Sequence, residues 1–232
     1  MLKKKEHGKM GRNNLDWLQA LFHFSFGDYY DPNNKKFGVL RVFNDDIIAP
    51  KTGFDTHPHR DMEIITYIIE GKLTHEDSMG NKSSITRGQV QYMSAGTGVF
   101  HSEHNLEDEP IRSLQIWILP DAKDHTPNYG DQKFEWDERK NKWLHIISDK
   151  NGSAPIKINQ DTNFYVIELD QGKEIDFPVK ENRQAYLVQI EGNSTINNIK
   201  LETRDALEIY EEDIKIMADE TSHFILIEMA KQ

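Results

Sequence analysis

Two stretches of the sequence decide the fold, GFDTHPHRDMEIITYIIEG at residues 53–71 and GQVQYMSAGTGVFHSEHN at residues 88–105. The first stretch carries His57 and His59, two positions apart. The second carries His101 and Glu103 at the same spacing. Side chains two apart in a β-strand point to the same face. Two such strands lying side by side would direct three imidazoles and a carboxylate at one point, which is a ligand set for a divalent transition metal with open coordination positions.

The spacing leaves open which carboxylate completes this set. Glu63 follows His59 by four residues and shares its parity along a straight strand, whereas Glu103 shares the parity of His101. The chain has no cysteine, so a metal must be held by nitrogen and oxygen. A closed structural zinc site usually includes cysteine. Four nitrogen and oxygen ligands around an octahedral ion instead leave two positions for substrate and dioxygen, and a carboxylate there can also act as a base.

The composition excludes several classes of function. The 232 residues have a net charge of -11, which disfavours binding to nucleic acid phosphates. No apolar run approaches the ~18 to 20 residues needed to span a bilayer. The basic start, MLKKKEHGKMGRNN, is not followed by the apolar segment of a secretory signal. We therefore expect a cytoplasmic protein that contacts neither nucleic acid nor membrane.

Strand signals dominate the chain, because β-branched and aromatic runs alternate with turn residues. The predicted strands are Phe37–Phe43, Glu63–Ile69, Gln89–Met93, Ile111–Leu119, Phe164–Leu169, Ala185–Ile190, Ala206–Tyr210 and Phe224–Met229. The segment DSMGN at Asp77–Asn81 predicts a hairpin turn. Helical periodicity is weak and favours only short helices, at Asn14–Phe22 and near Phe134–Arg139.

The two halves of the chain resemble each other, which indicates a duplicated β unit. IITYIIEG at 64–71 parallels AYLVQIEG at 185–192, and ITRG at 85–88 parallels ETRD at 202–205, with the connection four residues shorter in the second half. Counted from these anchors, the four ligand positions hold different residues in the second half: Pro178, Lys180, Ala218 and Glu220. The scaffold repeats and the ligands do not. We therefore expect one metal in a domain of residues 1–125, and a metal-free domain of residues 126–232.

Three motifs, HPHRDMEI (57–64), HEDSMGN (75–81) and MSAGTGVFHSE (93–103), are similar to those of the pirin family in the cupin superfamily, especially its short bacterial members with quercetinase-type activity. The similarity covers about residues 22–119. It implies an all-β bicupin, with two antiparallel β-barrel (jelly-roll) domains packed face to face and a few short helices. It also implies the metal ligands His57, His59, His101 and Glu103. Glu63, at the position of the glutamate that many other cupins use, is then either structural or a residue that supports the ligands from outside the metal's coordination sphere.

The resemblance further implies a metal-dependent dioxygenase, an oxidoreductase that opens flavonols such as quercetin by 2,3-dioxygenation with release of carbon monoxide. The cofactor would be one divalent transition metal per chain, with iron(II) favoured and zinc, manganese, nickel, copper and cobalt as alternatives. Glu103 would be the catalytic base, and the partners would be a small aromatic substrate and dioxygen. Phe54, Met93 and Gln115 are the candidate pocket residues.

Two other functions stay open at this point. Eukaryotic pirins, which the chain also resembles, are associated with transcription cofactor roles. A non-catalytic, metal-binding regulatory or redox-sensing protein that acts through protein partners is therefore the first alternative. A cupin isomerase or sugar-binding module is the second, although the H-x-E pair gives it poor support.

Overall fold

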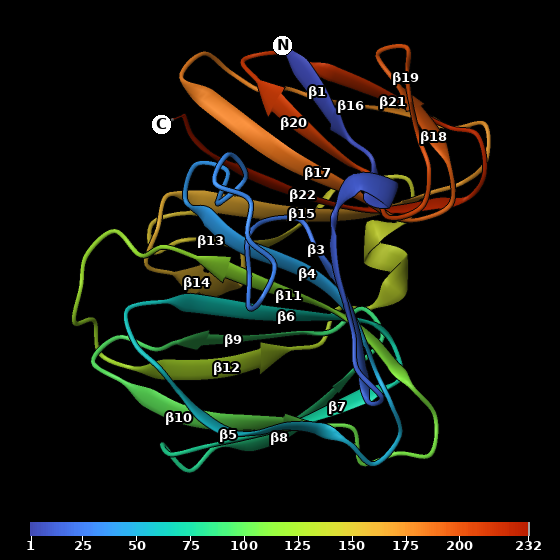
Figure 1. Ribbon diagram of the computed structural model, residues 1–232. Coiled ribbons are helices and arrows are strands. Elements are labelled where there is room, and N and C mark those ends of the chain that lie inside the picture. The colour runs from blue at the N-terminus through green and yellow to red at the C-terminus, as the bar shows by residue number, and fades with distance from the viewer. Residues whose placement is uncertain (232) are drawn as a thin grey trace. The chain divides into compact units, whose positions relative to one another are not determined.

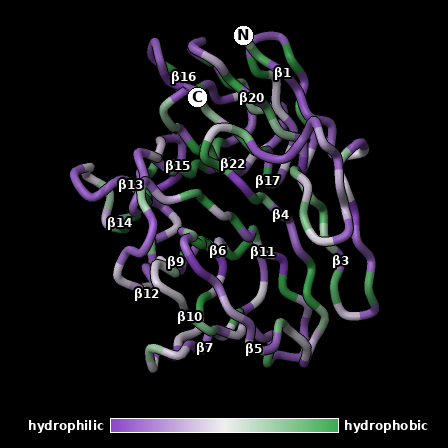
Figure 2. The backbone as a smooth tube through the Cα atoms, turned by 60° about the vertical axis from the view of Figure 1, so that its left-hand side comes forward, coloured by the Kyte–Doolittle hydropathy of each residue, from purple (hydrophilic) through white to green (hydrophobic). Residues whose placement is uncertain are grey.

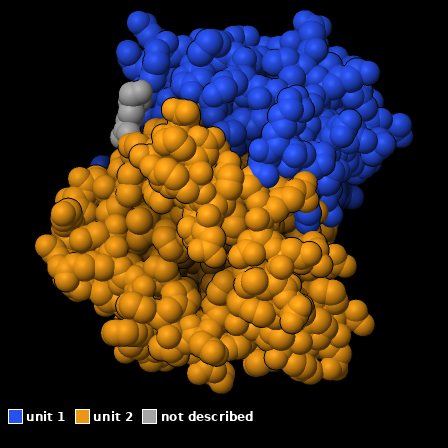
Figure 3. Space-filling view, in the orientation of Figure 1, with its two compact units in different colours: residues 1–10, 135–157, 161–232 blue, residues 11–134, 158–160 orange. Residues whose placement is uncertain are grey.

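The computed structural model describes residues 1–231 (Figure 1). In this range the chain forms strands and turns, and its helical segments are two 3₁₀ helices, η1 (His7–Lys9) and η2 (Trp136–Arg139). None of the described helices is long and apolar enough to cross a membrane. The chain divides into two compact units, coloured in Figure 3. Unit 1 comprises residues 1–10, 135–157 and those from Asp161 onward, and unit 2 comprises residues 11–134 and 158–160.

Unit 2, all of which lies in the described range, contains two antiparallel sheets. In spatial order, the strands of the larger sheet are β12 (Asn128–Gln132), β9 (Val90–Ser94), β6 (Glu63–Glu70), β11 (Ile111–Ile118), β4 (Leu40–Ile48), β3 (Leu18–Phe22) and β2 (Gly11–Asn14). Those of the smaller sheet are β5 (Gly53–His59), β10 (Val99–His104), β7 (Lys72–Asp77) and β8 (Lys82–Thr86). Leu18, Phe22 and Ile68 of the larger sheet pack with Leu73 and Ile85 of the smaller one. The core of unit 2 therefore lies between the two sheets.

The described part of unit 1 repeats this plan. Its larger sheet has, in spatial order, β1 (Leu2–Lys5), β20 (Ala206–Tyr210), β17 (Arg183–Glu191), β22 (Ser222–Ala230), β15 (Thr162–Leu169), β13 (Leu144–Asp149) and β14 (Ile156–Ile158), the last residue of which already belongs to unit 2. Its smaller sheet has β16 (Glu174–Phe177), β21 (Ile214–Ala218), β18 (Ser194–Ile196) and β19 (Ile199–Leu201). Residues from both sheets again share one apolar cluster, among them Leu187 and Phe177. The chain is therefore an all-β bicupin, as predicted.

The eight predicted strands are present, as β4, β6, β9, β11, β15, β17, β20 and β22. Figure 2 shows apolar colouring along strands such as β11 and β3, and hydrophilic colouring in many of the connecting loops. The predicted hairpin turn joins β7 to β8, where Asp77 Oδ1 accepts hydrogen bonds from the backbone N–H groups of Met79 and Asn81. The predicted helix at Asn14–Phe22 is wrong. Leu15 and Leu18 exchange backbone hydrogen bonds of 2.8 and 3.3 Å in the turn between β2 and β3.

The units differ from the predicted division at residues 125 and 126. β12 pairs with β9, so unit 2 continues through this strand to Phe134. β1 pairs with β20, with Leu2 opposite Ile209, so the first ten residues belong to unit 1. Both differences have the same physical cause. Backbone hydrogen bonds pair strands that are distant in the sequence, and a domain boundary inferred from local composition takes no account of such pairing.

The repeat is visible in the backbone as well as in the sequence. Gly71 and Gly192 have φ of 83° and 77°, a left-handed conformation that favours glycine. Gly88 and Arg204 have φ of 75° and 73°. Gly88 N–H donates to Ile68 O, and Arg204 N–H donates to Gln189 O, three residues before each repeated glycine. Arg204, rather than Asp205, is therefore the equivalent of Gly88, and the connection is five residues shorter in unit 1 rather than four.

Candidate metal centre and its cavity

Strands β5 and β10 are neighbours in the smaller sheet of unit 2 and carry the two predicted residue pairs (Figure 1). His57 lies opposite His101 in the antiparallel register. The Nε2 atoms of these two rings are 3.1 Å apart. The centroid of the His59 ring lies 4.8 Å from the centroid of the His57 ring and 4.8 Å from that of the His101 ring. One ligand nitrogen from each of the three residues lies within 4.8 Å of the others. The structure thus brings three of the four predicted ligands to one point.

The three imidazoles have the chemistry that a divalent metal needs. Burial, and to a smaller extent the neighbouring imidazoles, lower the pKa of His59 to about 4 and that of His101 to about 3. Neutral rings present an unprotonated nitrogen to a metal. Two nitrogens bound at ~2.1 Å to one octahedral ion are ~3.0 Å apart, close to the 3.1 Å between His57 and His101. The residues therefore fit a transition metal that accepts imidazole ligands.

Glu103 is buried beside this group, and its carboxylate is held by a row of polar side chains. Oε1 accepts hydrogen bonds from Thr66 Oγ1 at 3.0 Å and from Gln91 Nε2. Oε2 accepts one from Gln115 Nε2 at 2.8 Å. Thr66 lies opposite both glutamines, in β9 and in β11, so the three donors form one continuous row across the larger sheet. They fix the carboxylate without neutralising it, because none of them is charged.

The structure groups Glu103 with His101 and His75, whose potential ligand atoms all lie within 4.8 Å of one another. His75 is fully buried. Its Nδ1 lies 3.5 Å from His101 Nδ1 and its Nε2 lies 3.0 Å from Asp77 Oδ2. Asp77 and His75 therefore support the side of the His101 ring that faces away from His57. Such outer partners commonly fix the tautomer and orientation of a ligating histidine.

His75 is the residue that the sequence reasoning missed. Its sequence signal was present, because His75 and Asp77 are also two apart on one strand. Burial by itself raises the pKa of Asp77, but hydrogen bonds from His75, Asn81 and Met79 outweigh burial and lower it. Asp77 is therefore an ionised partner for the His75 ring.

Glu63 has a different environment, although its parity allowed it to be a ligand. Its Oε1 accepts hydrogen bonds from Ser94 Oγ at 2.7 Å and from Asn159 Nδ2 at 3.0 Å. Its Oε2 accepts one from the Asn159 backbone N–H at 3.2 Å. These contacts attach residues 158–160 to β6 and β9 within unit 2. Glu63 thus joins segment 158–160 to the sheet of unit 2. It belongs neither to the group of His57, His59 and His101 nor to that of His75, His101 and Glu103.

A cavity of about 280 Å³ opens beside the three imidazoles and Glu103. Its remaining lining residues are Asn13, Leu18, Ala20, Phe22, Phe26, Gly27, Asp28, Asn44, Asp46, Phe54, Gln115 and Trp117. Two of the three predicted pocket residues, Phe54 and Gln115, are among them. Met93 is not, and the prediction for this residue is wrong. Met93 is buried in a separate cluster with Ile64 and Val99, although it lies two residues from Gln91 on β9 and therefore shares that residue's face of the strand.

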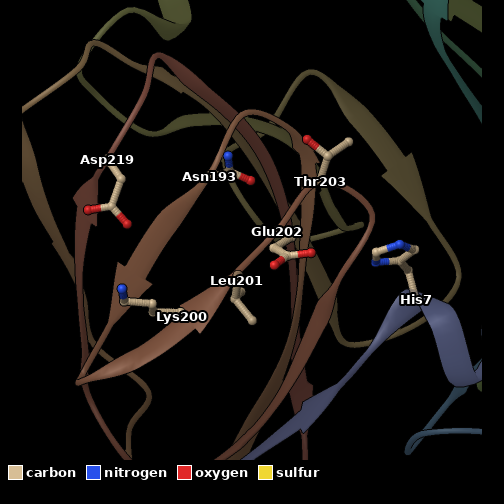
Figure 4. Close-up of a pocket in the computed structure, with 7 residues that line it drawn as sticks. All are labelled: His7, Asn193, Lys200, Leu201, Glu202, Thr203 and Asp219. Carbon is tan, nitrogen blue, oxygen red and sulfur yellow. The ribbon is translucent and has the colours of Figure 1, made fainter.

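Unit 1 has a cavity of its own, lined by His7, Asn193, Lys200, Leu201, Glu202, Thr203 and Asp219 (Figure 4). Lys200 and Asp219 lie on one side of the opening and His7 on the other (Figure 4). His7 Nδ1 is 2.9 Å from Asp205, and Thr203 Oγ1 donates to Gly192 O. Those two side chains are therefore engaged in contacts within the protein, and we assign no ligand to this cavity.

The register equivalents of the ligand positions in unit 1 are apolar. His101 pairs with His57, and the equivalent pair in β21 and β16 is Ile214 with Phe177. Both are buried in the core of unit 1. The expectation that the ligands are not repeated therefore agrees with the register, but the equivalent positions are not those counted along the sequence: Pro178, Lys180, Ala218 and Glu220.

Two family profiles match the chain. The profile described as Pirin matches residues 3–118. The profile described as a quercetinase C-terminal cupin domain matches residues 145–229. The two matches fall in the two halves of the sequence that show the internal repeat.

Similar proteins cover the whole length of the chain. It is 40% identical over 231 residues to a quercetin 2,3-dioxygenase of Escherichia coli K12, a match that covers 99% of each chain. It is 41% identical over 232 residues to a pirin-like protein of Caulobacter vibrioides, covering 99% of this chain and 100% of that one. The crystal structure of bacterial pirin YhhW from Escherichia coli in complex with nickel(II) is 38% identical, with a TM-score of 0.93 and 100% coverage of both chains.

Proposed function

The chain belongs to the pirin family of the cupin superfamily, and on this premise we propose that it is a metal-dependent dioxygenase that opens flavonols such as quercetin with release of carbon monoxide. The observation that supports this most is the cavity beside the imidazoles. His57, His59, His101 and Glu103 line one part of it, and apolar and aromatic side chains line much of the rest. Apolar walls with a few convergent polar groups are typical of a small-molecule site. A relative that bears the name quercetin 2,3-dioxygenase covers the whole chain.

We propose that His57, His59 and His101 hold one divalent ion, with Glu103 as the fourth ligand. A mixed set of imidazoles and a carboxylate suits iron(II), which we propose as the native metal. The bacterial pirin structure contains nickel(II), and nickel is therefore the first alternative to test. When bound, the metal supplies a Lewis acid at which substrate oxygens and dioxygen can meet.

Glu103 is the proposed base for the flavonol hydroxyl. It is 2% exposed, so little water competes for its carboxylate. The neutral donors Thr66, Gln91 and Gln115 hold it in place without removing its charge. Its carboxylate oxygen accepts the hydroxyl proton, and the deprotonated ring that results is electron-rich and open to oxidation. A base of this kind must lie within hydrogen-bond reach of the proton that it removes.

The aromatic walls orient a flat ligand and exclude water from the reacting atoms. The Trp117 ring meets the His59 ring edge to face at 4.9 Å and the Phe26 ring at 5.3 Å. Phe54 packs edge-on against Trp17 at 5.1 Å. Offset and edge-to-face contacts of this kind stabilise aromatic clusters. A planar aromatic substrate can extend the same packing.

The test is oxygen uptake and carbon monoxide release when the iron(II)-loaded protein is supplied with quercetin. Wild-type protein should consume oxygen and release carbon monoxide. His101→Ala should do neither while keeping the strand content of the wild type by circular dichroism. Repeating the assay after loading with nickel(II) identifies the active metal. Metal binding at one ion per chain without turnover of quercetin by any loaded form would refute the dioxygenase and favour a metal-dependent binding role.

A further inference from the structure

Two polar residues of the cavity wall, Asn44 and Asp46, have no role in the proposed reaction. Asn44 and Asp46 lie two apart on β4, and both line the cavity. Asn44 is 2% exposed and Asp46 is 4% exposed. Asn44 Oδ1 and Asp46 Oδ1 are buried, and neither has a hydrogen-bond partner among residues 1–231. An unpaired buried polar atom is destabilising, so two of them in one wall indicate a role that outweighs this cost.

An ion pair within the fold does not explain Asp46. The intervening residue, Asp45, points to the other face of β4 and pairs with Arg112 through contacts of 3.0 and 2.7 Å. That cation is therefore held on the opposite side of the strand. Burial, with Asp45 and Glu103 nearby, raises the pKa of Asp46. A protonated carboxyl can both accept and donate a hydrogen bond.

The position of the pair relative to Glu103 follows from the sheet register. Asn44 lies opposite Gln115, which holds Glu103. Neighbouring strands are ~4.8 Å apart, and residues two apart on a strand are ~7 Å apart. Asn44 thus extends the polar row by one strand, and Asp46 lies one step further along β4. A ligand with one end at Glu103 can reach both residues with its far end.

We propose that Asn44 and Asp46 form a recognition subsite for hydroxyl groups of the substrate that are remote from the reacting one. Ligand hydroxyls would donate to Asn44 Oδ1 and Asp46 Oδ1, and the aromatic walls would hold the ring between them and Glu103. The preferred ligands are then polyhydroxylated flat aromatics rather than apolar ones. This inference rests on the proposed function for the class of ligand.

The repeated unit supports a specific role for these two side chains. Asn44 pairs with Gln115 in unit 2, and the equivalent pair in unit 1 is Tyr165 with Leu226. By the same register, the equivalent of Asp46 is Ile167, which is part of the apolar core. The fold does not require an amide and a carboxyl at these positions.

The test compares the binding of three flavonols under nitrogen, where no turnover consumes them. Quercetin, galangin, which lacks the two catechol hydroxyls of quercetin, and 3-hydroxyflavone, which keeps only the 3-hydroxyl, differ in remote hydroxyl groups alone. Binding is followed by the quenching of tryptophan fluorescence, since Trp117 lines the cavity. Asn44→Leu and Asp46→Leu replace the polar atoms with apolar groups of similar size. In each variant, the ratio of the 3-hydroxyflavone and quercetin dissociation constants should fall about tenfold from its wild-type value. Galangin shows which ring carries the recognised hydroxyls.

Gln184→Leu is the matched control, because it removes a buried amide with an unpartnered Nε2 in unit 1. It should leave the ratio unchanged. Asn44→Leu and Asp46→Leu should keep or raise the unfolding temperature, since each removes an unpaired buried polar atom. A ratio that stays within twofold of wild type in both variants, or wild type that binds none of the three flavonols, would overturn the subsite. Binding with the expected ratios but without oxygen uptake would instead refute only the dioxygenase.

Discussion

Glu103 in β10 and Ile216 in β21 occupy the same position in the two repeated units. Glu103 pairs with His75 and Ile216 pairs with Ile196, and these two partners each lie four residues after the repeated glycine. The row of side chains beside this position is polar in unit 2, where it consists of Thr66, Gln91 and Gln115. The equivalent row in unit 1 is apolar and consists of Leu187, Leu207 and Leu226. Unit 1 shows that the sandwich needs no carboxylate at this position to fold.

Glu103→Ile should therefore destabilise unit 2 by about 2–4 kcal/mol, because it removes the acceptor of the hydrogen bonds that Gln91, Gln115 and Thr66 donate to the carboxylate. Urea unfolding followed by fluorescence measures the change. A variant that also carries Leu at those three positions copies the packing of unit 1 and should recover most of the loss. Glu103→Gln should cost less, since the Gln115 amide can turn to meet it. A loss below about 0.5 kcal/mol for Glu103→Ile would show that the row does not depend on this carboxylate.

Most of the fold could be predicted because the strands are buried on at least one face. Runs such as Glu63–Glu70 consist mostly of β-branched residues, and nearly all of them are buried. Such runs are therefore identified as strands from the sequence. The spacing predicts a helix at Asn14–Phe22, where the structure has a turn and then the strand Leu18–Phe22, because the apolar residues Leu15, Leu18 and Phe22 also have the spacing of a helix. In the structure Leu15 is 44% exposed at a turn, whereas Leu18 and Phe22 are buried. Only the tertiary context separates these two readings.

The site was predictable where it depends on spacing along one strand and not where it depends on pairing between strands. Parity placed His57 and His59 on one face, and adjacent strands brought His101 to them. The polar row that holds Glu103 has one residue from each of three strands, so no local sequence pattern predicts it. The same limit applies to His75, whose contact with His101 crosses from β7 to β10.

His75→Ala should weaken metal binding by about 10–100-fold, because the His101 ring loses the neighbour that fixes its orientation. Asp77→Asn should have a smaller effect in the same direction. Competition with a chromophoric chelator measures the affinity for zinc(II) or nickel(II) without any turnover. His145→Ala is the matched control, since His145 stacks on Tyr165 at 4.4 Å in unit 1 as His75 stacks on Tyr129 at 4.2 Å. Equal affinities in wild type and His75→Ala would exclude a positioning role for His75.

Glu63→Ala should lower stability without changing the amount of metal bound. The substitution leaves Ser94 Oγ and two Asn159 donors without their acceptor, at a cost of about 2–4 kcal/mol. Elemental analysis of the folded variant should still give the wild-type metal content, whereas His101→Ala should have lost most of it. A Glu63→Ala protein that unfolds like wild type and lacks metal would make Glu63 a ligand.

Asp205 should make the stability of unit 1 depend on pH below about pH 4. It anchors the N-terminal segment through Lys4 Nζ at 2.8 Å and the backbone N–H of His7 at 2.8 Å. Burial by itself raises the pKa of Asp205, but hydrogen bonds from Lys4, His7 and Glu202 outweigh burial and lower it. A carboxyl with a lowered pKa in the folded state adds stability above its unfolded pKa of ~3.9. That stability is lost as the pH falls through the folded pKa.

Asp205→Asn should therefore lower the unfolding temperature at pH 7, and the gap from wild type should narrow as the pH is lowered below about 4. Differential scanning calorimetry between pH 3 and pH 7 measures both proteins under the same conditions. Glu211→Gln is the control, because Glu211 also has a lowered pKa but pairs with Lys231 at the surface, where solvent weakens the interaction. It should change the unfolding temperature little at any pH. A gap for Asp205→Asn that is constant across this range would mean that the Asp205 charge contributes nothing to the anchoring of β1.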